Sequence, residues 1–279
     1  MTAGVIGARE ALTLCGPLLS RRRLLIVSDF DGTLSPTVAD PWAAAIVPAA
    51  RRALRALAGR PGVDVALLSG RTASDLATRV RVGGARYLGN HGIERAVLPR
   101  RGRAERIVVA LPEDAGGHER EAARIGDRLR ALVDEPWLVV EAKGPAITFH
   151  YRSAPDVTTA GRRVAAAVEQ LDPGGRFVRY PGRRALELRP PGAIAKGEAT
   201  AALLDEIRPA AALLLGDDVS DAEAFGELRR RRDAGDLAGL ALAVVARDEV
   251  PDEVAAMSDA VLASPLEAAR LLARLAAVV

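Results

Sequence analysis

Two aspartates two positions apart, Asp29 and Asp31, directly follow the apolar run 24–28 and precede Gly32. In an extended chain, side chains at positions i and i+2 point to the same side, so the two carboxylates should lie together while Phe30 packs on the other side. One carboxylate can attack a phosphorus atom while its neighbour moves a proton, and a hard divalent cation would relieve their repulsion. The pair therefore indicates phosphate chemistry. The alternative is a strand-end turn with solvated acids, since Asp-Gly is common in turns.

A second acidic cluster follows the apolar run 213–215 and consists of Asp217, Asp218 and Asp221. Ligands of open α/β sheets bind at the carboxyl ends of the strands, so this cluster is expected beside the first pair. Crowded carboxylates are costly without a cation. Mg²⁺ is the predicted ion, because it prefers oxygen ligands and the chain has no Cys/His cluster for zinc. Asp221 could also serve as a helix cap beside Ser220.

A lysine and a serine complete the candidate phosphate site. Of the 39 basic residues only Lys143 and Lys196 are lysines, and the compact ammonium of lysine is not interchangeable with the planar fork of arginine. Lys196 stands at a predicted helix start, where an ammonium beside amide donors would hold phosphate. Ser69 follows the apolar run 63–68 and offers a hydroxyl to a phosphoryl oxygen. The alternatives are a solvated lysine and an ordinary turn serine.

Apolar strand patterns alternate with helical patterns over most of the chain, which predicts a parallel sheet covered on both faces. The charged segment 229–236 is interpreted as a solvated loop. The predicted strands are 24–28, 63–68, one near Tyr87, 211–215 and 241–245, and the predicted helices are 48–58, 73–80, one after Lys196, one from Asp221 and one from Pro265.

The pattern changes between residues 107 and 184, where two amphipathic helices are interleaved with hairpin-like strands. This indicates a small α+β domain inserted into a larger one. We therefore predict a core of residues 1–106 and 185–279 and an inserted domain of residues 107–184. The helices of this segment are expected at 119–133 and 157–171 and its strands at 137–141, 146–151 and 176–180, with a further strand at 185–188.

The composition is that of an ordinary globular chain, with 279 residues, 49% hydrophobic residues and a net charge of +3. Aromatic residues make up only 3%, so we expect no nucleic-acid partner. The single cysteine, Cys15, cannot form an internal disulfide and is predicted to be a small buried hydrophobe. The apolar segment 11–19 is too short to span a bilayer, and arginines 21–23 follow it, opposite to a secretory signal. A cytoplasmic location without a membrane partner is predicted.

The four pieces in their order along the chain resemble the haloacid dehalogenase superfamily. They are Asp29-x-Asp31-Gly-Thr, Ser69, Lys196 and Gly-Asp217-Asp218-x-x-Asp221. The resemblance implies an α/β fold with a Rossmann-like parallel sheet core and an inserted α+β cap domain that closes over substrate and excludes water. It also implies that Asp29 is the nucleophile and Asp31 the general acid/base.

A closer resemblance, to trehalose-6-phosphate phosphatases, extends along most of the chain. It rests on the segments 29–37, 68–71, 89–94, 140–144, 150–152, 187–190, 196–197 and 216–225. It implies that Glu141, Lys143, Arg152 and Glu187 bind the disaccharide hydroxyls and that Asn90, His91 and Gly92 line the mouth of the site. Without the resemblance, Glu141 and Lys143 could be a surface ion pair, and His150 and Tyr151 would be partly buried strand residues.

The expected reaction is the Mg²⁺-dependent hydrolysis of trehalose 6-phosphate to trehalose and phosphate through an aspartyl phosphate. The ion is expected on Asp29, the Asp31 carbonyl and Asp217, with Asp218 and Asp221 in support, and association with a trehalose-6-phosphate synthase is possible. The alternatives are a phosphatase for sucrose phosphate or a phosphoglycerate glycoside, and a non-catalytic sugar-phosphate sensor. A phosphomutase is also conceivable, although the sequence offers no phosphate-donor site.

Overall fold

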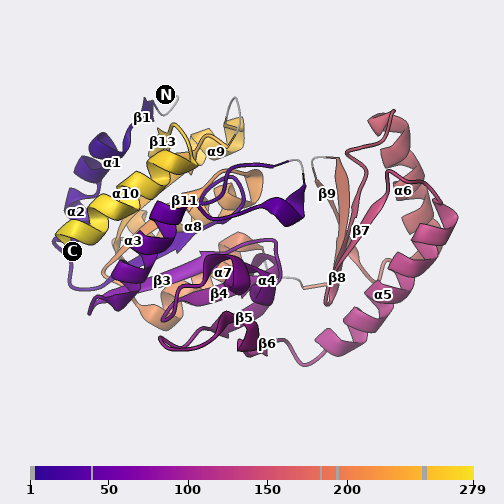
Figure 1. Ribbon diagram of the computed structural model, residues 1–279, viewed down its shortest axis with the longest axis horizontal. Coiled ribbons are helices and arrows are strands. Elements are labelled where there is room, and N and C mark those ends of the chain that lie inside the picture. The colour runs from indigo at the N-terminus through magenta and orange to yellow at the C-terminus, as the bar shows by residue number, and fades with distance from the viewer. Residues whose placement is uncertain (1–3, 39, 183, 193–194, 247–249) are drawn as a thin grey trace. The chain divides into compact units, whose positions relative to one another are not determined.

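The protein is described by a computed structural model that covers residues 4–38, 40–182, 184–192, 195–246 and 250–279. The chain divides into two compact units, each with its own sheet (Figure 1). The larger unit is Met1–Ala110 with Ile194–Val279, and the smaller is Leu111–Ala193. The predicted boundary after residue 184 lies too early, because residues 185–189 form a strand that pairs within the smaller sheet.

The larger sheet contains nine strands within the described residues, and the central strands are parallel. Its strands, in spatial order, are β1 (Val5–Ile6), β13 (Ala260–Leu262), β12 (Ala238–Val244), β11 (Ala211–Gly216), β2 (Leu24–Ser28), β3 (Val63–Leu68), β4 (Arg86–Gly89), β5 (Glu94–Val97) and β6 (Val109–Ala110). Only the β4–β5 and β5–β6 pairings of this sheet are antiparallel among the described residues. The predicted α/β class is confirmed, and the antiparallel edge was not predicted because strands of two to four residues carry little periodicity.

Strand β2 is buried on both faces of the sheet, as a central parallel strand should be. Leu24 and Ile26 belong to one hydrophobic cluster, whereas Leu25 and Val27 belong to the other. On the first face lie α1 (Ala8–Leu14), α2 (Gly16–Leu19), α3 (Pro48–Gly59), α4 (Ala73–Val80) and α10 (Pro265–Val278). On the second face lie α7 (Lys196–Ile207), α8 (Val219–Asp233) and α9 (Asp252–Met257). The two layers hold β2 rigidly at the centre of the unit.

The charged segment 229–236 is mostly helical, so its interpretation as a loop was wrong. Helix α8 continues to Asp233 because its arginines are paired along and across the helix surface. Arg230 and Arg231 both bind Glu227, and Arg232 binds Asp259. Arginine is also a good helix former, so a run of this residue does not end a helix.

The apolar segment near the N-terminus forms α1 and α2, which pack on the sheet. Cys15, between the two helices, is buried as predicted, and burial raises the pKa of its thiol to about 12. None of the helices in the described ranges is long and apolar enough to cross a membrane.

The smaller unit is a four-stranded antiparallel sheet with two helices on one face. The strands lie in the order β7 (Val139–Lys143), β8 (Ala146–His150), β10 (Ala185–Arg189) and β9 (Val178–Gly182), and the helices are α5 (Ala115–Leu132) and α6 (Val157–Leu171). Ile147, Phe149 and Leu188 project into a hydrophobic cluster with both helices. Because strand side chains alternate, the residues between them project to the other face of the sheet, which is polar.

The buried Tyr87, in β4, bonds to the backbone of the segment just before its own strand and provides a test of the fold. The hydroxyl of Tyr87 accepts a hydrogen bond from the Val82 amide at 2.8 Å and donates one to the Val82 carbonyl at 3.0 Å. Tyr87→Phe should lower the free energy of unfolding by about 1–3 kcal/mol, because both backbone groups would be buried without a partner. Urea denaturation measures this loss, and a loss below about 0.5 kcal/mol would show that the two bonds contribute little.

Candidate active site

Four neighbouring strands deliver polar residues to one edge of the larger sheet. They are β11, β2, β3 and β4, which lie side by side and parallel. Asp217 follows β11, Asp29 follows β2, Ser69 follows β3, and the segment 90–92 follows β4. The carboxyl ends of parallel strands are the usual ligand-binding edge of an open α/β sheet.

Lys196 lies at the centre of this edge and joins two buried carboxylates. Its Nζ is 2.9 Å from Asp29 Oδ1 and 2.8 Å from Asp221 Oδ1. The side chain of Lys196 is 1% exposed, so its ammonium is removed from water and depends on these partners. Helix α7 begins at Lys196, and this position at the first helical residue holds the ammonium at the edge of the sheet.

Three carboxylates gather at the same place. One oxygen from each of Asp29, Asp217 and Asp221 lies within 4.8 Å of the others. Oxygen donors at this spacing suit a hard divalent cation. The Asp221 oxygens also accept bonds from Lys196 and from the amides of Asp217 and Asp218, whereas Asp217 is oriented by the Thr33 hydroxyl at 2.9 Å. Asp29 and Asp217 are therefore better placed than Asp221 to hold an ion.

The carboxylates are electrostatically costly in this arrangement. Burial raises the pKa of Asp217 well above its usual range, and the nearby Asp29 and Asp221 add to the shift. Burial likewise raises the pKa of Asp29, an effect that Lys196 opposes and Asp221 reinforces. A bound divalent cation would favour the ionised carboxylates, so the donor set fits a metal ion.

Asp31 is held by Arg71, a residue to which the sequence analysis assigned no role. Arg71 Nε lies 2.6 Å from Asp31 Oδ2, and Arg71 Nη2 lies 2.8 Å from Asp31 Oδ1. Such a bidentate pair fixes both oxygens of the carboxylate. Arg71 Nη1 also donates to Asp75 at 2.9 Å, which anchors the guanidinium to α4. The position of Arg71 two residues after Ser69, at a strand exit, was the available signal.

Asp218 is the N-cap of α8, the role that the sequence analysis had offered to Asp221. Its Oδ1 accepts hydrogen bonds from the Ser220 amide and hydroxyl and from the Asp221 amide. Desolvation alone would raise the pKa of Asp218, but the charge of Lys196 and the bond from Ser220 lower it to about 2. Asp218 thus stays ionised and fixes the start of the helix that carries Asp221.

Two glycines allow the acidic residues to approach the backbone. Gly32 has φ of +85°, and a Cβ atom there would lie 2.2 Å from Asp217 Oδ2. At Gly216 a Cβ atom would lie 2.3 Å from Asp221 Cγ. Any larger residue at either position would therefore displace a carboxylate of the cluster.

The segment 90–92 is tied to the exit of β3. The amide of Asn90 donates to the Arg71 carbonyl at 2.7 Å, and the amide of His91 donates to the Ser69 carbonyl at 2.9 Å. The Asn90 side-chain amide donates to Glu94 at 2.6 Å, a buried contact that the sequence did not indicate. Asn90, His91 and Gly92 all have positive φ, and this tight turn places them beside Ser69.

The polar face of the smaller sheet carries the predicted sugar-binding residues. Strand register aligns Glu141, Thr148 and Glu187 in one row across β7, β8 and β10. Lys143 Nζ lies 3.8 Å from Glu141 and 3.7 Å from Glu187, between the two carboxylates. His150 Nε2 lies 2.8 Å from Glu141 Oε2. These charged groups form one cluster, which we call the cap-face cluster.

Arg189, which the sequence did not indicate, and the predicted Arg152 extend the cap-face cluster. Arg189 Nη2 donates to Glu187 at 2.9 Å, and its guanidinium lies 4.2 Å from the centre of the Tyr180 ring. Arg152 Nη2 reaches His150 Nδ1 at 3.5 Å, which is a weak contact. The buried Thr148 hydroxyl and Arg189 Nε have no hydrogen-bond partner within the described residues. Such groups suit a ligand that is rich in hydroxyls.

Comparison with known proteins finds a matching family and several similar proteins. The profile of a family described as trehalose-phosphatase matches residues 27–259. A trehalose-phosphate phosphatase of Mycobacterium avium is 34% identical over 275 residues, which is 96% of this chain and 66% of that protein. An uncharacterized glycosyl hydrolase of Mycobacterium tuberculosis is 36% identical over 219 residues, covering 76% of this chain and 16% of that protein. The chain thus spans less than two thirds of the length of these relatives.

Solved structures share the fold. The C-terminal domain of the trehalose-6-phosphate phosphatase of C. albicans superposes with a TM-score of 0.74 at 22% identity, covering 99% of both chains. The C-terminal domain of a Candida albicans trehalose synthase regulatory protein gives a TM-score of 0.67 at 14% identity, covering 97% of this chain and 99% of that one. A haloacid dehalogenase-like hydrolase from Bacteroides thetaiotaomicron gives 0.58 at 17% identity, covering 91% and 99%. The predicted haloacid dehalogenase-like fold is confirmed.

The bridge between Lys196 and two carboxylates predicts a large stability effect. Lys196→Met should destabilise the metal-free protein by about 3–5 kcal/mol, because Asp29 and Asp221 would keep their burial and lose the cation between them. Denaturant titration in the presence of a chelator measures this loss. Lys143→Met is the matched control, since Lys143 lies in the other unit at longer distances from its carboxylates. An equal loss in both variants would contradict the central role of Lys196.

Proposed function

The chain belongs to the trehalose-phosphatase family, and from that premise we propose that it is a metal-dependent phosphatase that hydrolyses trehalose 6-phosphate to trehalose and phosphate. The observation that carries the proposal is the buried Lys196 bridge between Asp29 and Asp221, beside Asp217. A nucleophile, a phosphate-binding ammonium and metal-binding oxygens are thereby combined at one edge of the sheet.

In the proposed reaction Asp29 attacks the phosphorus atom in line and forms an aspartyl phosphate. Asp31 donates a proton to the departing sugar oxygen and then accepts one from the attacking water. The bidentate contact with Arg71 fixes both oxygens of the Asp31 carboxylate, the form of the group that accepts a proton from the attacking water. Lys196 and Ser69 would bind the transferred phosphoryl oxygens.

A divalent metal ion, proposed to be Mg²⁺, would be held by Asp29 and Asp217 with the Asp31 carbonyl. Bound there, it would supply positive charge to the transferring phosphoryl group. Asp221 and Asp218 would support the site without holding the ion. Asp221 orients Lys196, and Asp218 fixes the start of α8. Asp29 and Asp217 would be ionised in the loaded protein.

The cap-face cluster is proposed to recognise the sugar. Glu141 and Glu187 present acceptors in one row, and the Lys143 ammonium between them is a donor. A disaccharide needs several charged partners to replace its water. Arg152 and the segment Asn90–Gly92 are proposed to contribute further contacts. His150 is a positioning residue in this scheme, because it holds Glu141.

A second candidate function is that of a non-catalytic sugar-phosphate sensor. The fold shared with the C-terminal domain of a trehalose synthase regulatory protein favours it, as would association with a trehalose-6-phosphate synthase. A sensor needs neither a nucleophile nor its proton donor, yet Asp29 and Asp31 are both present and held by cationic partners. Phosphatase activity is therefore the better supported function.

The nucleophile assignment predicts the effect of an isosteric change. Asp29→Asn should lower kcat for phosphate release from trehalose 6-phosphate by at least about a thousandfold, because an amide cannot form the acyl phosphate. A phosphate-release assay with Mg²⁺ and with a chelator measures it, and the chelator should abolish wild-type activity. Turnover by Asp29→Asn at a rate near that of the wild type would refute the assignment.

The sugar assignment predicts a selective loss. Glu141→Ala should lower kcat/KM for trehalose 6-phosphate at least about tenfold, because a charged hydrogen-bond partner is removed, and should leave hydrolysis of a small aryl phosphate nearly unchanged. Glu119→Ala, an exposed change in the same unit, is the matched control. The wild type should prefer trehalose 6-phosphate over sucrose phosphate and glucosyl phosphoglycerate. A higher kcat/KM for either competitor would refute the assignment of trehalose 6-phosphate as the substrate.

A further inference from the structure

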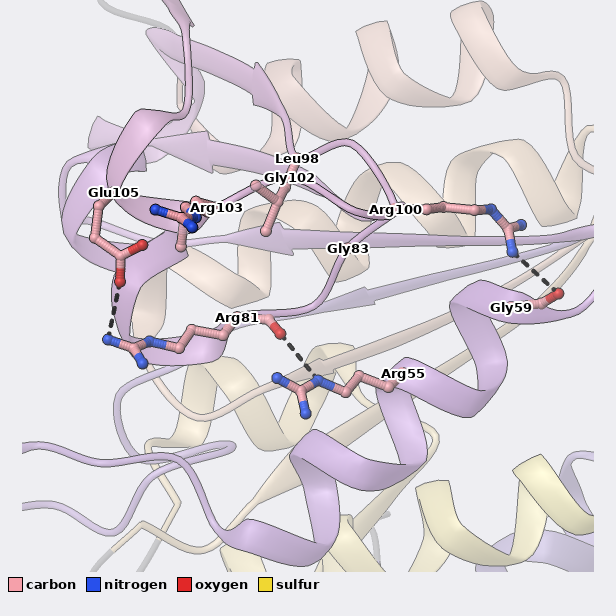
Figure 2. A pocket seen from close by; sticks show the side chains of 10 residues that line it. Arg55, Gly59, Arg81, Gly83, Leu98, Arg100, Gly102, Arg103 and Glu105 are labelled. Carbon is pink, nitrogen blue, oxygen red and sulfur yellow. Dashed lines mark hydrogen bonds and ion pairs between the residues drawn. The ribbon is translucent and has the colours of Figure 1, made fainter.

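A pocket of about 470 Å³ lies in the larger unit (Figure 2). It is lined by the end of α3, by the segment between α4 and β4, and by the loop after β5. Gly59 precedes β3 and Arg81 precedes β4, so the pocket lies at the amino ends of these strands. The proposed catalytic residues follow their carboxyl ends. Because β3 has six residues, the two sites are separated by about 20 Å along the strand.

The lining of the pocket is strongly basic. Four of its ten residues are arginines and one is a glutamate, and its only large apolar side chain is Leu98. The arginines are Arg55, Arg81, Arg100 and Arg103, and all four are exposed. They come from three separate segments that converge on the pocket (Figure 2). This lining favours a small polyanion over an apolar ligand.

The structural contacts of these arginines leave donors for a ligand. Arg55 Nε donates to the Arg81 carbonyl at 3.0 Å, and Arg100 Nη1 approaches the Gly59 carbonyl at 3.4 Å. Each contact uses one of the five N–H donors of a guanidinium. Figure 2 shows Arg55 directed toward the backbone of Arg81 and Arg100 directed toward Gly59 at the end of α3. Arg81 pairs with Glu105 of the same pocket at 3.1 Å. A bound anion would replace the Glu105 carboxylate as the partner of Arg81.

Glycines allow the backbone segments that line the pocket to pack closely. A Cβ atom at Gly83 would lie 2.5 Å from the Arg100 carbonyl oxygen, so the loop after β5 can pack here only against a glycine. The Gly102 amide donates to the Pro99 carbonyl at 2.7 Å in a tight turn, where a Cβ atom at Gly102 would lie 2.9 Å from Pro99 Cδ. The loop that carries Arg100 and Arg103 is thus fastened to the segment that carries Arg81.

The positive charge extends beyond the pocket itself. Burial and the charges of Arg55 and Arg81 together lower the pKa of the neighbouring Arg51. A site where cations already disfavour one another gains from an anion, because the anion relieves their repulsion.

We propose that this pocket binds a diphosphate-bearing anion at a site separate from the catalytic edge. Guanidinium groups bind phosphate oxygens in bidentate geometry, and arginines on three segments can contact more than one phosphate group. A single phosphate would fill only a small part of the volume. The diphosphate could be free or esterified to a nucleoside, since the chemistry recognised at the arginines is the same.

Calorimetric titration of the whole chain with inorganic pyrophosphate, in chelator so that no metal is bound, tests the proposal. One saturable site is expected, with weaker binding of inorganic phosphate. Arg103→Glu should weaken the binding at least about tenfold, because a charged hydrogen-bond donor is lost and a negative charge is added. Glu105→Gln should strengthen it, because the competing carboxylate is removed. A parallel titration with ADP shows whether the ester is accepted.

Arg101→Glu is the matched control, because Arg101 is an exposed neighbour that does not line the pocket. It changes the net charge as Arg103→Glu does and should leave the affinity within about twofold. Equal weakening by both variants, or the absence of saturable binding to the wild type, would overturn the proposal. Binding that survives Arg103→Glu but is lost in Lys196→Met would place pyrophosphate at the catalytic edge and would also overturn it.

Discussion

The arrangement of the larger unit depends on one buried ammonium. Lys196, at the start of α7, holds Asp29, which follows β2, and Asp221, in the first turn of α8, at hydrogen-bond distance. Burial makes each of these charges costly alone, so the segments are stable together only in this geometry. The same contact orients the proposed nucleophile. Lys196 holds one oxygen of the Asp29 carboxylate, and this contact together with the strand end sets the direction of the other oxygen.

The site divides its tasks between backbone and side chains. Glycines at 32 and 216 allow the carboxylates to approach closely, and Arg71 and Thr33 orient Asp31 and Asp217. The smaller unit has a separate hydrophobic cluster and presents its charged residues on the opposite face of its sheet. The residues proposed for phosphate chemistry and those proposed for sugar recognition are therefore supported by different hydrophobic clusters.

Much of this could be predicted because the informative signals are local. A buried strand followed by acids marks both Asp29 and Asp217, and the scarcity of lysine pointed to Lys196 and Lys143. The Arg71–Asp31 pair was missed because it joins residues 40 apart, and its geometry depends on how the exit of β3 folds back. The helical part of 229–236 was missed because a charged run with a glycine was interpreted as a loop, although Arg230 and Arg231 pair locally with Glu227 and Arg232 pairs with the remote Asp259. Short edge strands likewise depend on their neighbours more than on their own pattern.

Asp29, one of the two carboxylates that Lys196 holds, is the proposed acceptor of the phosphoryl group. Acid quenching during turnover of trehalose 6-phosphate, followed by borohydride reduction and peptide mass spectrometry, tests it directly, because reduction converts an aspartyl phosphate to homoserine. We expect conversion at Asp29 alone, with Asp31 unchanged. Conversion at Asp31, or phosphate release at full rate with no trapped aspartate, would contradict it.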